Sequence, residues 1–184
     1  MGFVAGALLL QTTEEEAYAC MVSLLTGSPR LPPLRGLWSP GFPLLKRSLF
    51  HLEGLLKHYE PRCSAALGAV GVPASLYATP WLLTLYGACL PGPWLARTMD
   101  AVAHRGLPAA LAVALALVRA SWPHLKRGGF EGCVGALSAR GVRATLRAGL
   151  SPDELLARAD SYPRLTAHLR SLDRDYDAAE DAGG

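Results

Sequence analysis

Histidine and cysteine are the first side chains to consider as metal ligands or nucleophiles in this sequence. The five histidines and four cysteines are scattered along the 184 residues, and no cysteine belongs to a C-x-x-C pair. His51 and His58 lie seven residues apart on one expected helix. We interpret them as polar residues of its surface, because no third ligand accompanies them. The cysteines lie in apolar settings, which is typical of buried free thiols. The pattern therefore predicts no metal site and no cofactor.

Other catalytic patterns are also missing from the sequence. It contains no Gly-rich phosphate loop, no G-x-S-x-G motif and no set of nucleophile, base and orienting residue. The formal net charge of +3 is small and gives no reason to expect nucleic-acid binding. Hydrophobic residues make up 51% of the chain, which excludes general disorder and suits one domain with a core.

Two apolar stretches raise the question of a membrane span. Residues 71–96 carry no charge, but four prolines interrupt them. The stretch Leu107–Val118 has twelve residues, whereas a spanning helix needs about twenty. Both stretches favour buried helices of an all-α core, so we predict no integral membrane segment. A small membrane protein remains the third alternative for the function.

The elements that position these residues are helices, because no alternating strand pattern occurs. The segment 109–120 is apolar on all sides, which predicts a central helix. Pro80 indicates either a kink or a helix start capped by Thr79. Trp38 is expected to fix the loop 28–43 to the body. Thr13 and Glu16 predict a capping box at the start of the helix that Gly27 ends. Leu45, Leu49, Leu52 and Leu56 form the apolar stripe of the expected helix 44–59. The other expected helices are 1–10, 62–70, one around Trp81 that ends before Pro91, 93–105, 109–120, 130–140, one starting at Ser151, and 163–175.

The helix around Trp81 is the most informative segment. Tyr77, Trp81 and Leu85 repeat at helical spacing in a stretch without charge. Together with Leu115 of the central helix they form the predicted structural core.

Several blocks of the chain resemble the TBC domains, which are GTPase-activating domains for Rab GTPases. Met1–Leu10 resembles the stretch that follows the family's Tyr-x-Gln motif, and Ser75–Tyr86 is the most specific block. Arg97 and Asp100 resemble the family's Arg-x-x-Asp helix, on which we expect the two side chains to pair locally. Phe130-Glu131 resembles its Phe-Glu pair, although Gly129 stands where Asp is usual. The resemblance runs in family order from Met1 to about Leu137.

The resemblance implies an all-α, multi-helix TBC-like domain that activates a GTP-bound Rab in vesicle trafficking. In the family, an arginine from an Ile-x-x-Asp-x-x-Arg motif neutralises charge on the phosphoryl group, and the glutamine of Tyr-x-Gln orients water. Neither motif occurs in this sequence, so the chain is expected to be N-terminally incomplete. The resemblance thus leads us to expect no catalytic residue in this chain and an activator of a GTPase, not an enzyme. If the chain alone were active, Gln11, Arg30 and Arg35 would be the residues to examine.

The resemblance also sets the expected organisation and partners. Residues 1–176 are expected to be a partial Rab-GAP TBC domain, and residues 177–184 a disordered acidic tail. Gly2 and Phe3 are the candidates for partner binding. The expected location is cytoplasmic, with recruitment to endomembranes through the Rab. The alternative function is a finger-less adaptor that binds a Rab or a helical partner without activating it.

Overall fold

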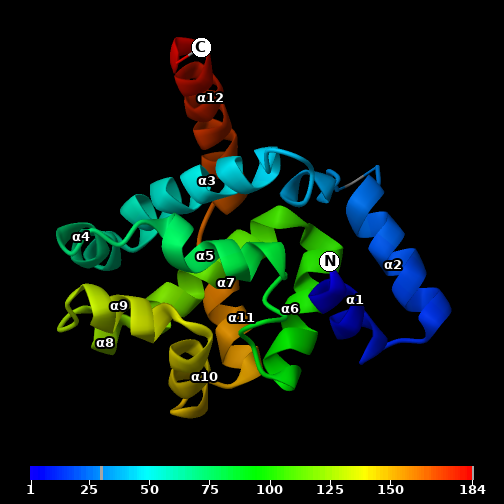
Figure 1. The fold of residues 1–184 in the computed structure, drawn as a ribbon, viewed down its shortest axis with the longest axis horizontal. Coiled ribbons are helices and arrows are strands. Elements are labelled where there is room, and N and C mark those ends of the chain that lie inside the picture. The colour runs from blue at the N-terminus through cyan, green and yellow to red at the C-terminus, as the bar shows by residue number, and fades with distance from the viewer. Residues whose placement is uncertain (30, 184) are drawn as a thin grey trace.

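The computed structural model describes residues 1–29 and 31–183, and the regular secondary structure of these residues is helical (Figure 1). An isolated β-bridge pairs Ser28 with Leu31 in the loop after the second helix. The all-α class predicted from the sequence is confirmed.

A central helix, α7 (Leu107–Ala120), organises the packing. Every residue from Ala109 to Val118 is buried, as predicted for a helix that is apolar on all sides. Its most extensive contacts are with α3 (Pro43–Tyr59), α6 (Gly92–Arg105) and α11 (Pro152–Asp160). The core therefore lies around α7, and the neighbouring helices cover it with one apolar face each.

The amphipathic helix α3 shows how such a face arises. Leu45, Leu52 and Leu56 follow one another at helical spacing and are buried, while Lys46 and Lys57 are exposed. The short helix α4 (Pro61–Ala69) follows directly.

The helix that carries Trp81 is α5 (Ala74–Leu83), and it excludes one of the two alternatives for Pro80, the helix start capped by Thr79. It starts at Ala74, so Pro80 lies inside the helix rather than at its beginning. It ends at Leu83, before Pro91 as expected, because Leu85 and Tyr86 adopt left-handed φ angles of 42° and 69°. This turn directs the Tyr86 side chain into the core, where its hydroxyl donates to the Ala110 carbonyl oxygen at 2.5 Å.

The N-terminal helices are α1 (Gly2–Leu9) and α2 (Glu14–Thr26). The predicted capping box at the start of α2 is confirmed, since Thr13 and Glu16 each accept from the other's backbone N–H. The loop that follows contains a short 3-10 helix, η1 (Arg35–Leu37). Trp38 fixes this loop to the body, as expected, by donating from Nε1 to the Leu83 carbonyl oxygen at 2.8 Å.

The segment after α7 contains three short helices, α8 (Trp122–Leu125), α9 (Phe130–Leu137) and α10 (Ala139–Arg147). The expectation of one helix over 130–140 is wrong, and α10 was not predicted. Ser138 breaks the helix because its backbone is extended, and its hydroxyl caps α10 by accepting from the Gly141 N–H.

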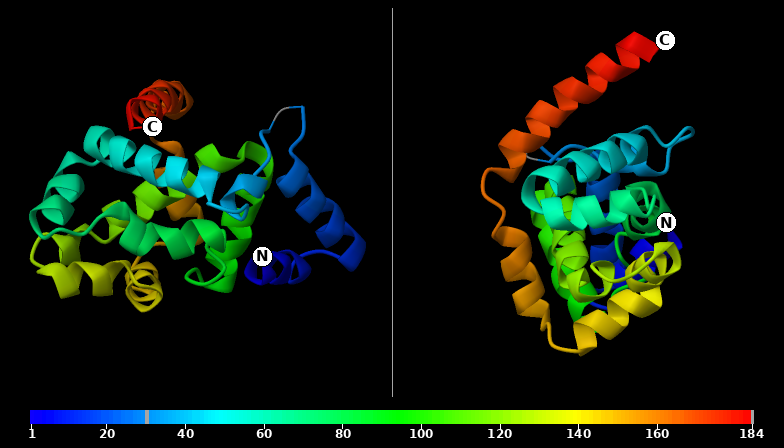
Figure 2. Two further views of the ribbon diagram at one scale, coloured as in Figure 1. Left: turned by 45° about the horizontal axis from the view of Figure 1, so that its top comes forward. Right: turned by 90° about the vertical axis from the view of Figure 1, so that its left-hand side faces the viewer.

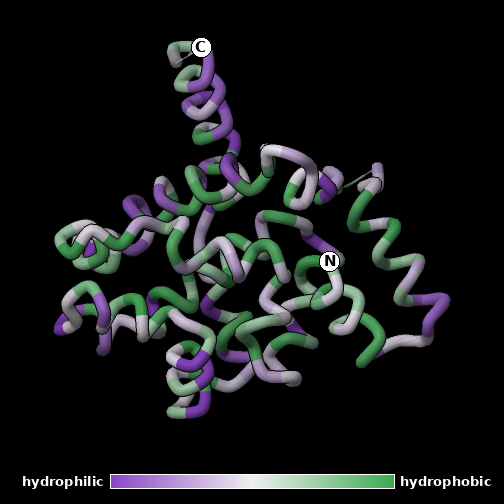
Figure 3. The backbone as a smooth tube through the Cα atoms, viewed as in Figure 1, coloured by the Kyte–Doolittle hydropathy of each residue, from purple (hydrophilic) through white to green (hydrophobic). Residues whose placement is uncertain are grey.

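The last helix, α12 (Leu165–Gly183), projects from the body in Figure 1 and in the right-hand view of Figure 2. It is mostly hydrophilic, whereas α1 is mostly hydrophobic (Figure 3). Residues 177–183 are helical here, which differs from the disordered tail expected from Asp177, while Gly184 lies outside the described residues. Contacts with α3 account for the difference, because Arg47 forms ion pairs with both Asp173 and Asp177.

Candidate functional site

The two candidates for partner binding, Gly2 and Phe3, lie at the start of α1. Val4, Ala7 and Leu8 are buried against the body, whereas the side chain of Phe3 is 58% exposed. The backbone of α1 approaches the turn after α5 closely. A Cβ atom added to Gly87 would lie 3.1 Å from Phe3 Cβ and 3.2 Å from the Phe3 carbonyl oxygen.

Large apolar side chains are exposed along both N-terminal helices. Leu10 is 81% exposed and Tyr18 is 74% exposed. We call this surface the apolar N-terminal face; its residues are Met1, Phe3, Leu9, Leu10, Tyr18 and Val22. A group of exposed apolar residues of this kind is typical of a surface that binds another protein segment.

The predicted core residues have no exposed surface for chemistry. Trp81, Tyr77, Leu85 and Leu115 are all buried. The rings of Tyr77 and Trp81 lie 5.2 Å apart. Burial raises the pKa of the Tyr77 and Tyr86 hydroxyls, so both remain protonated near neutral pH.

The expected local pair of Arg97 and Asp100 is wrong. Arg97 Nη2 instead lies 2.6 Å from Asp153 Oδ1 in the first turn of α11, and its Nε lies 3.0 Å from the same oxygen. The packing of α6 against α11 brings these side chains together across 56 residues of sequence. Both side chains are exposed, so the pair contributes at most about 1 kcal/mol.

The histidines lie in different environments. His51 is buried, which contradicts its interpretation as a surface residue, whereas His58 is exposed. His51 Nε2 lies 3.1 Å from Asp173 Oδ1, but the angle between the two groups does not allow a hydrogen bond to this nitrogen. Within 1–29 and 31–183, no group of three or more His, Cys, Asp or Glu residues could hold a metal ion.

Gln11, Arg30 and Arg35 are the residues to examine if the chain alone were active. Gln11 Nε2 donates to the Ala7 carbonyl oxygen at 3.1 Å and thereby satisfies the end of α1. Arg35 is exposed in η1. Arg30 lies outside the described residues.

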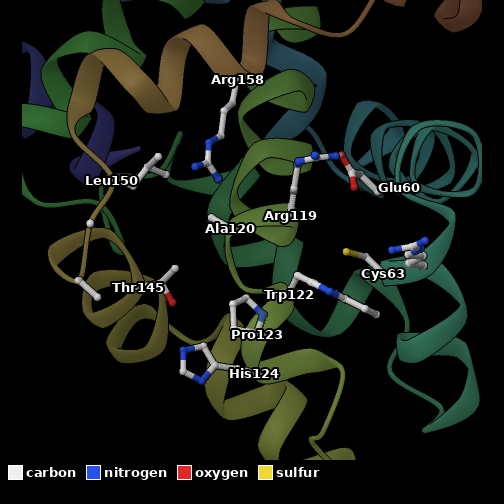
Figure 4. Close-up of a pocket in the computed structure, with 13 residues that line it drawn as sticks. Glu60, Cys63, Arg119, Ala120, Trp122, Pro123, His124, Thr145, Leu150 and Arg158 are labelled. Carbon is white, nitrogen blue, oxygen red and sulfur yellow. The ribbon is translucent and has the colours of Figure 1, made fainter.

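A basic cavity of about 600 Å³ opens between α4, α7, α8, α10 and α11 (Figure 4). Arg62, Arg119 and Arg158 line it together with His124, and Glu60 contributes a carboxylate. Arg119 Nη1 lies 2.8 Å from Glu60 Oε1, and the Tyr162 hydroxyl donates to the same oxygen at 3.1 Å. The nearby carboxylate raises the pKa of Arg119, so this side chain stays charged.

The thiol in this cavity is not a nucleophile. Burial, and then the charge of Glu60, raise the pKa of Cys63 to about 11. The thiol is therefore protonated at neutral pH.

Sequence reasoning did not find this cavity. Glu60, Arg119 and Arg158 are separated by 59 and 39 residues, so no spacing rule connects them. The one available signal was a glutamate directly before Pro61, at the junction of two helices.

Within the described part of the chain, no single helix has the length and apolar character needed to cross a membrane. The pair α4 and α5 meets the criterion together by length and composition, but the two helices are bent by 117°.

Comparisons with known proteins find similarity mainly in the N-terminal two thirds of the chain. The chain matches the family model of the RabGAP TBC domain over residues 1–127. It is 30% identical to the Rab GTPase-activating protein eat-17 of Caenorhabditis elegans over 174 residues, which cover 95% of this chain and 19% of that protein. It is 32% identical to the Rab GTPase-activating protein tbc-11 of the same organism over 132 residues, which cover 72% and 14%. It is 31% identical to the GTPase-activating protein GYP5 of Saccharomyces cerevisiae over 119 residues, which cover 64% and 13%. The chain spans about a fifth or less of the length of these relatives.

Proposed function

Because the chain belongs to the RabGAP TBC domain family, we propose that residues 1–176 are the C-terminal part of a domain that accelerates GTP hydrolysis by a Rab-type GTPase. The arginine and glutamine fingers belong to a segment N-terminal to this chain in the longer protein. Two facts support this arrangement. Neither finger motif occurs in the sequence, and the relatives are several times longer than the chain.

The apolar N-terminal face is the observation that carries the proposal. Phe3, Leu10 and Tyr18 expose apolar surface on helices that lie inside the region matched by the family model. Burying one such side chain contributes about 1.5–3 kcal/mol. We therefore assign this face to the segment that carries the fingers, and we place Gly2 and Phe3 where that segment meets the Rab.

The chemistry of GTP hydrolysis explains the different roles of the finger-bearing segment and of this chain. Negative charge develops on the phosphoryl oxygens in the transition state, and the attacking water must be aligned with the phosphorus. A guanidinium and an amide supplied by the partner stabilise the charge and orient the water. Positioning of this kind needs rigid support, which α7 and the helices packed around it provide. This chain supplies the support and no catalytic residue.

The proposed partner is a Rab-type GTPase with GTP bound, as the names of the two nematode relatives suggest. Such a partner implies a cytoplasmic protein that reaches endomembranes through the Rab.

Association with a finger-bearing segment tests this proposal. The segment that precedes the matched region in the eat-17 relative can be produced separately and mixed with this chain. We expect the two to associate. Phe3→Asp should weaken the association about tenfold or more, because a charge would replace a buried apolar contact.

Phe130→Asp is the matched control, because Phe130 is 50% exposed and lies on α9, away from the apolar N-terminal face. It should leave the association unchanged. Equal loss with both variants, or no association of the unchanged chain, would contradict the assignment of this face.

A further inference from the structure

We propose that the basic cavity of Figure 4 binds a phosphate monoester, with Arg62 and Arg158 as its cationic contacts. This site is distinct from the surface assigned to GTPase activation. The helices α8 to α10 on its border and the helices α1 and α2 lie towards opposite ends of the molecule's long axis (Figures 1 and 2).

The charges around the cavity are unbalanced. Three arginines line it, and Glu60 is the one carboxylate among its lining residues. Glu60 is already engaged by the Arg119 guanidinium and by the Tyr162 hydroxyl. The positive charges of Arg62 and Arg158 therefore remain available to a ligand.

Both of these arginines are exposed, and the described part of the chain shows no hydrogen bond or ion pair for either side chain. The close-up shows Arg158 extending from α11 towards Ala120, into the space between Leu150 and Arg119 (Figure 4). The carboxylate next to it on α11 belongs to Glu154, which accepts from the Ser151 backbone N–H at 2.7 Å. Arg158 thus points into the cavity, and the pKa of Glu154 is lowered mainly by its hydrogen bonds with Ser151 and less by the charge of Arg158.

The surroundings add to the positive potential. Residues 119–149 contain six arginines or lysines and one glutamate, a local net charge of +5 in a chain whose total is +3. Lys126, Arg127, Arg140 and Arg147 of this segment are exposed. A cluster of one sign attracts anions and raises their local concentration.

The chemistry of the lining selects a phosphate ester among anions. Guanidinium groups form paired hydrogen bonds with phosphate oxygens, and an ester with more than one phosphate can engage arginines on different sides of the cavity. The cavity, at about 600 Å³, is larger than a phosphate ion needs and lies within the usual range for small-molecule sites. Trp122 and Pro123 offer an apolar wall to the organic part of the ester.

The phosphate group could belong to a soluble ester or to a lipid headgroup. Two probes distinguish these sources. Inositol trisphosphate represents the soluble ester and is titrated into the full chain by calorimetry. Phosphatidylcholine vesicles with and without a phosphatidylinositol phosphate represent the lipid and are tested by co-sedimentation. Binding of the soluble probe alone identifies a soluble ester, and added retention on the phosphoinositide vesicles identifies a headgroup.

Charge-neutral variants test the cavity itself. Arg62→Gln and Arg158→Gln should each weaken binding of inositol trisphosphate about tenfold, as expected for the loss of a charge-assisted hydrogen bond. Arg147→Gln is the matched control, because it removes the same charge from the same basic region but does not line the cavity. It should change the affinity less than about twofold at physiological salt, where more distant charges are screened.

The thermal unfolding of all three variants should match that of the unchanged chain, because the three side chains are exposed. Equal weakening by Arg158→Gln and Arg147→Gln would overturn the proposal in favour of diffuse surface charge. Absence of binding to both probes would also overturn it. Neither result would affect the proposed GTPase activation, which is measured without these ligands.

Discussion

Trp81 is the residue with the clearest consequence for stability. It is 1% exposed, and the rings of Tyr77 and Tyr86 lie 5.2 Å and 6.3 Å from its own. Its environment is a packed aromatic cluster, so its contribution comes from burial and close contact.

We therefore expect Trp81→Ala to lower the free energy of unfolding by about 3–5 kcal/mol, the usual cost of removing a buried aromatic side chain. Chemical denaturation monitored by circular dichroism measures this change. Phe130→Ala, at a half-exposed position, should change it by about 0.5 kcal/mol or less. A folded Trp81→Ala variant that loses less than about 1 kcal/mol would exclude a core role.

His51 makes stability depend on pH. Burial lowers its pKa below the ordinary value of 6.5, and the positive charge of Arg47 acts in the same direction. Asp173 and Asp177 oppose this shift. The unfolded chain therefore binds a proton at His51 near pH 6.5, while the folded chain binds it only at lower pH.

The fold should accordingly be most stable above about pH 6.5 and lose stability as the pH falls towards the lowered pKa of His51. Thermal unfolding of the unchanged chain and of His51→Gln, compared between neutral pH and about pH 5, measures this effect. The variant should show a smaller loss of stability over that interval. His104→Gln, at an exposed histidine, should behave as the unchanged chain does; identical pH profiles for His51→Gln and the unchanged chain would refute this role.

Among the elements, the junction of α9 and α10 depends on one glycine. A Cβ atom added to Gly141 would lie 2.2 Å from the Gly135 carbonyl oxygen and 2.4 Å from that of Ala136. These are backbone atoms, so they cannot move aside as a flexible side chain would. The two helices can therefore meet at Ser138 only if residue 141 has no side chain.

Two substitutions of the same kind should therefore have opposite effects. Gly141→Ala should destabilise the fold by about 1–3 kcal/mol, because it overpacks the junction. Gly132→Ala, inside α9 with no atom within 4 Å of the added Cβ, should stabilise it by about 0.5–1 kcal/mol. Equilibrium denaturation of both variants tests the pair, and a neutral Gly141→Ala would disprove the close approach.

The elements also show what the sequence could predict. The capping box at Thr13, the stripe of α3 and the central position of α7 depend on local spacing, and all three were predicted correctly. The end of α5 before Pro91 was predicted too, but its place at Leu83 could not be, because the left-handed turn at Tyr86 is stabilised by Ala110, which lies 24 residues further along the chain. The helical end of α12 likewise depends on Arg47, far away in the sequence.

At the scale of the whole molecule, two surfaces are candidates for function. Residues of one were proposed from the sequence, whereas the other was found only in the structure. Phe3 and Gly2 of the apolar N-terminal face came from a family resemblance that covers contiguous residues. The basic cavity needed the three-dimensional structure, because its arginines come from α4, α7 and α11. Contacts between distant segments leave no local pattern, so no reading of neighbouring residues could have assembled that site.

The central claim is that this chain supports GTPase activation but lacks the groups that perform it. Single-turnover GTP hydrolysis across a panel of Rab GTPases tests it most directly. One arm uses the chain as given, and the other uses the chain joined to the finger-bearing segment of the eat-17 relative.

We expect no acceleration by the chain alone, since no side chain in it has the sequence context of either finger. The joined chain should accelerate hydrolysis by at least one Rab about 10³–10⁵-fold, the usual contribution of an arginine finger. Strong acceleration by the chain alone would contradict the account and direct attention to Gln11 and Arg35. No acceleration by the joined chain, with both motifs present, would contradict it as well and favour an adaptor without GTPase-activating function.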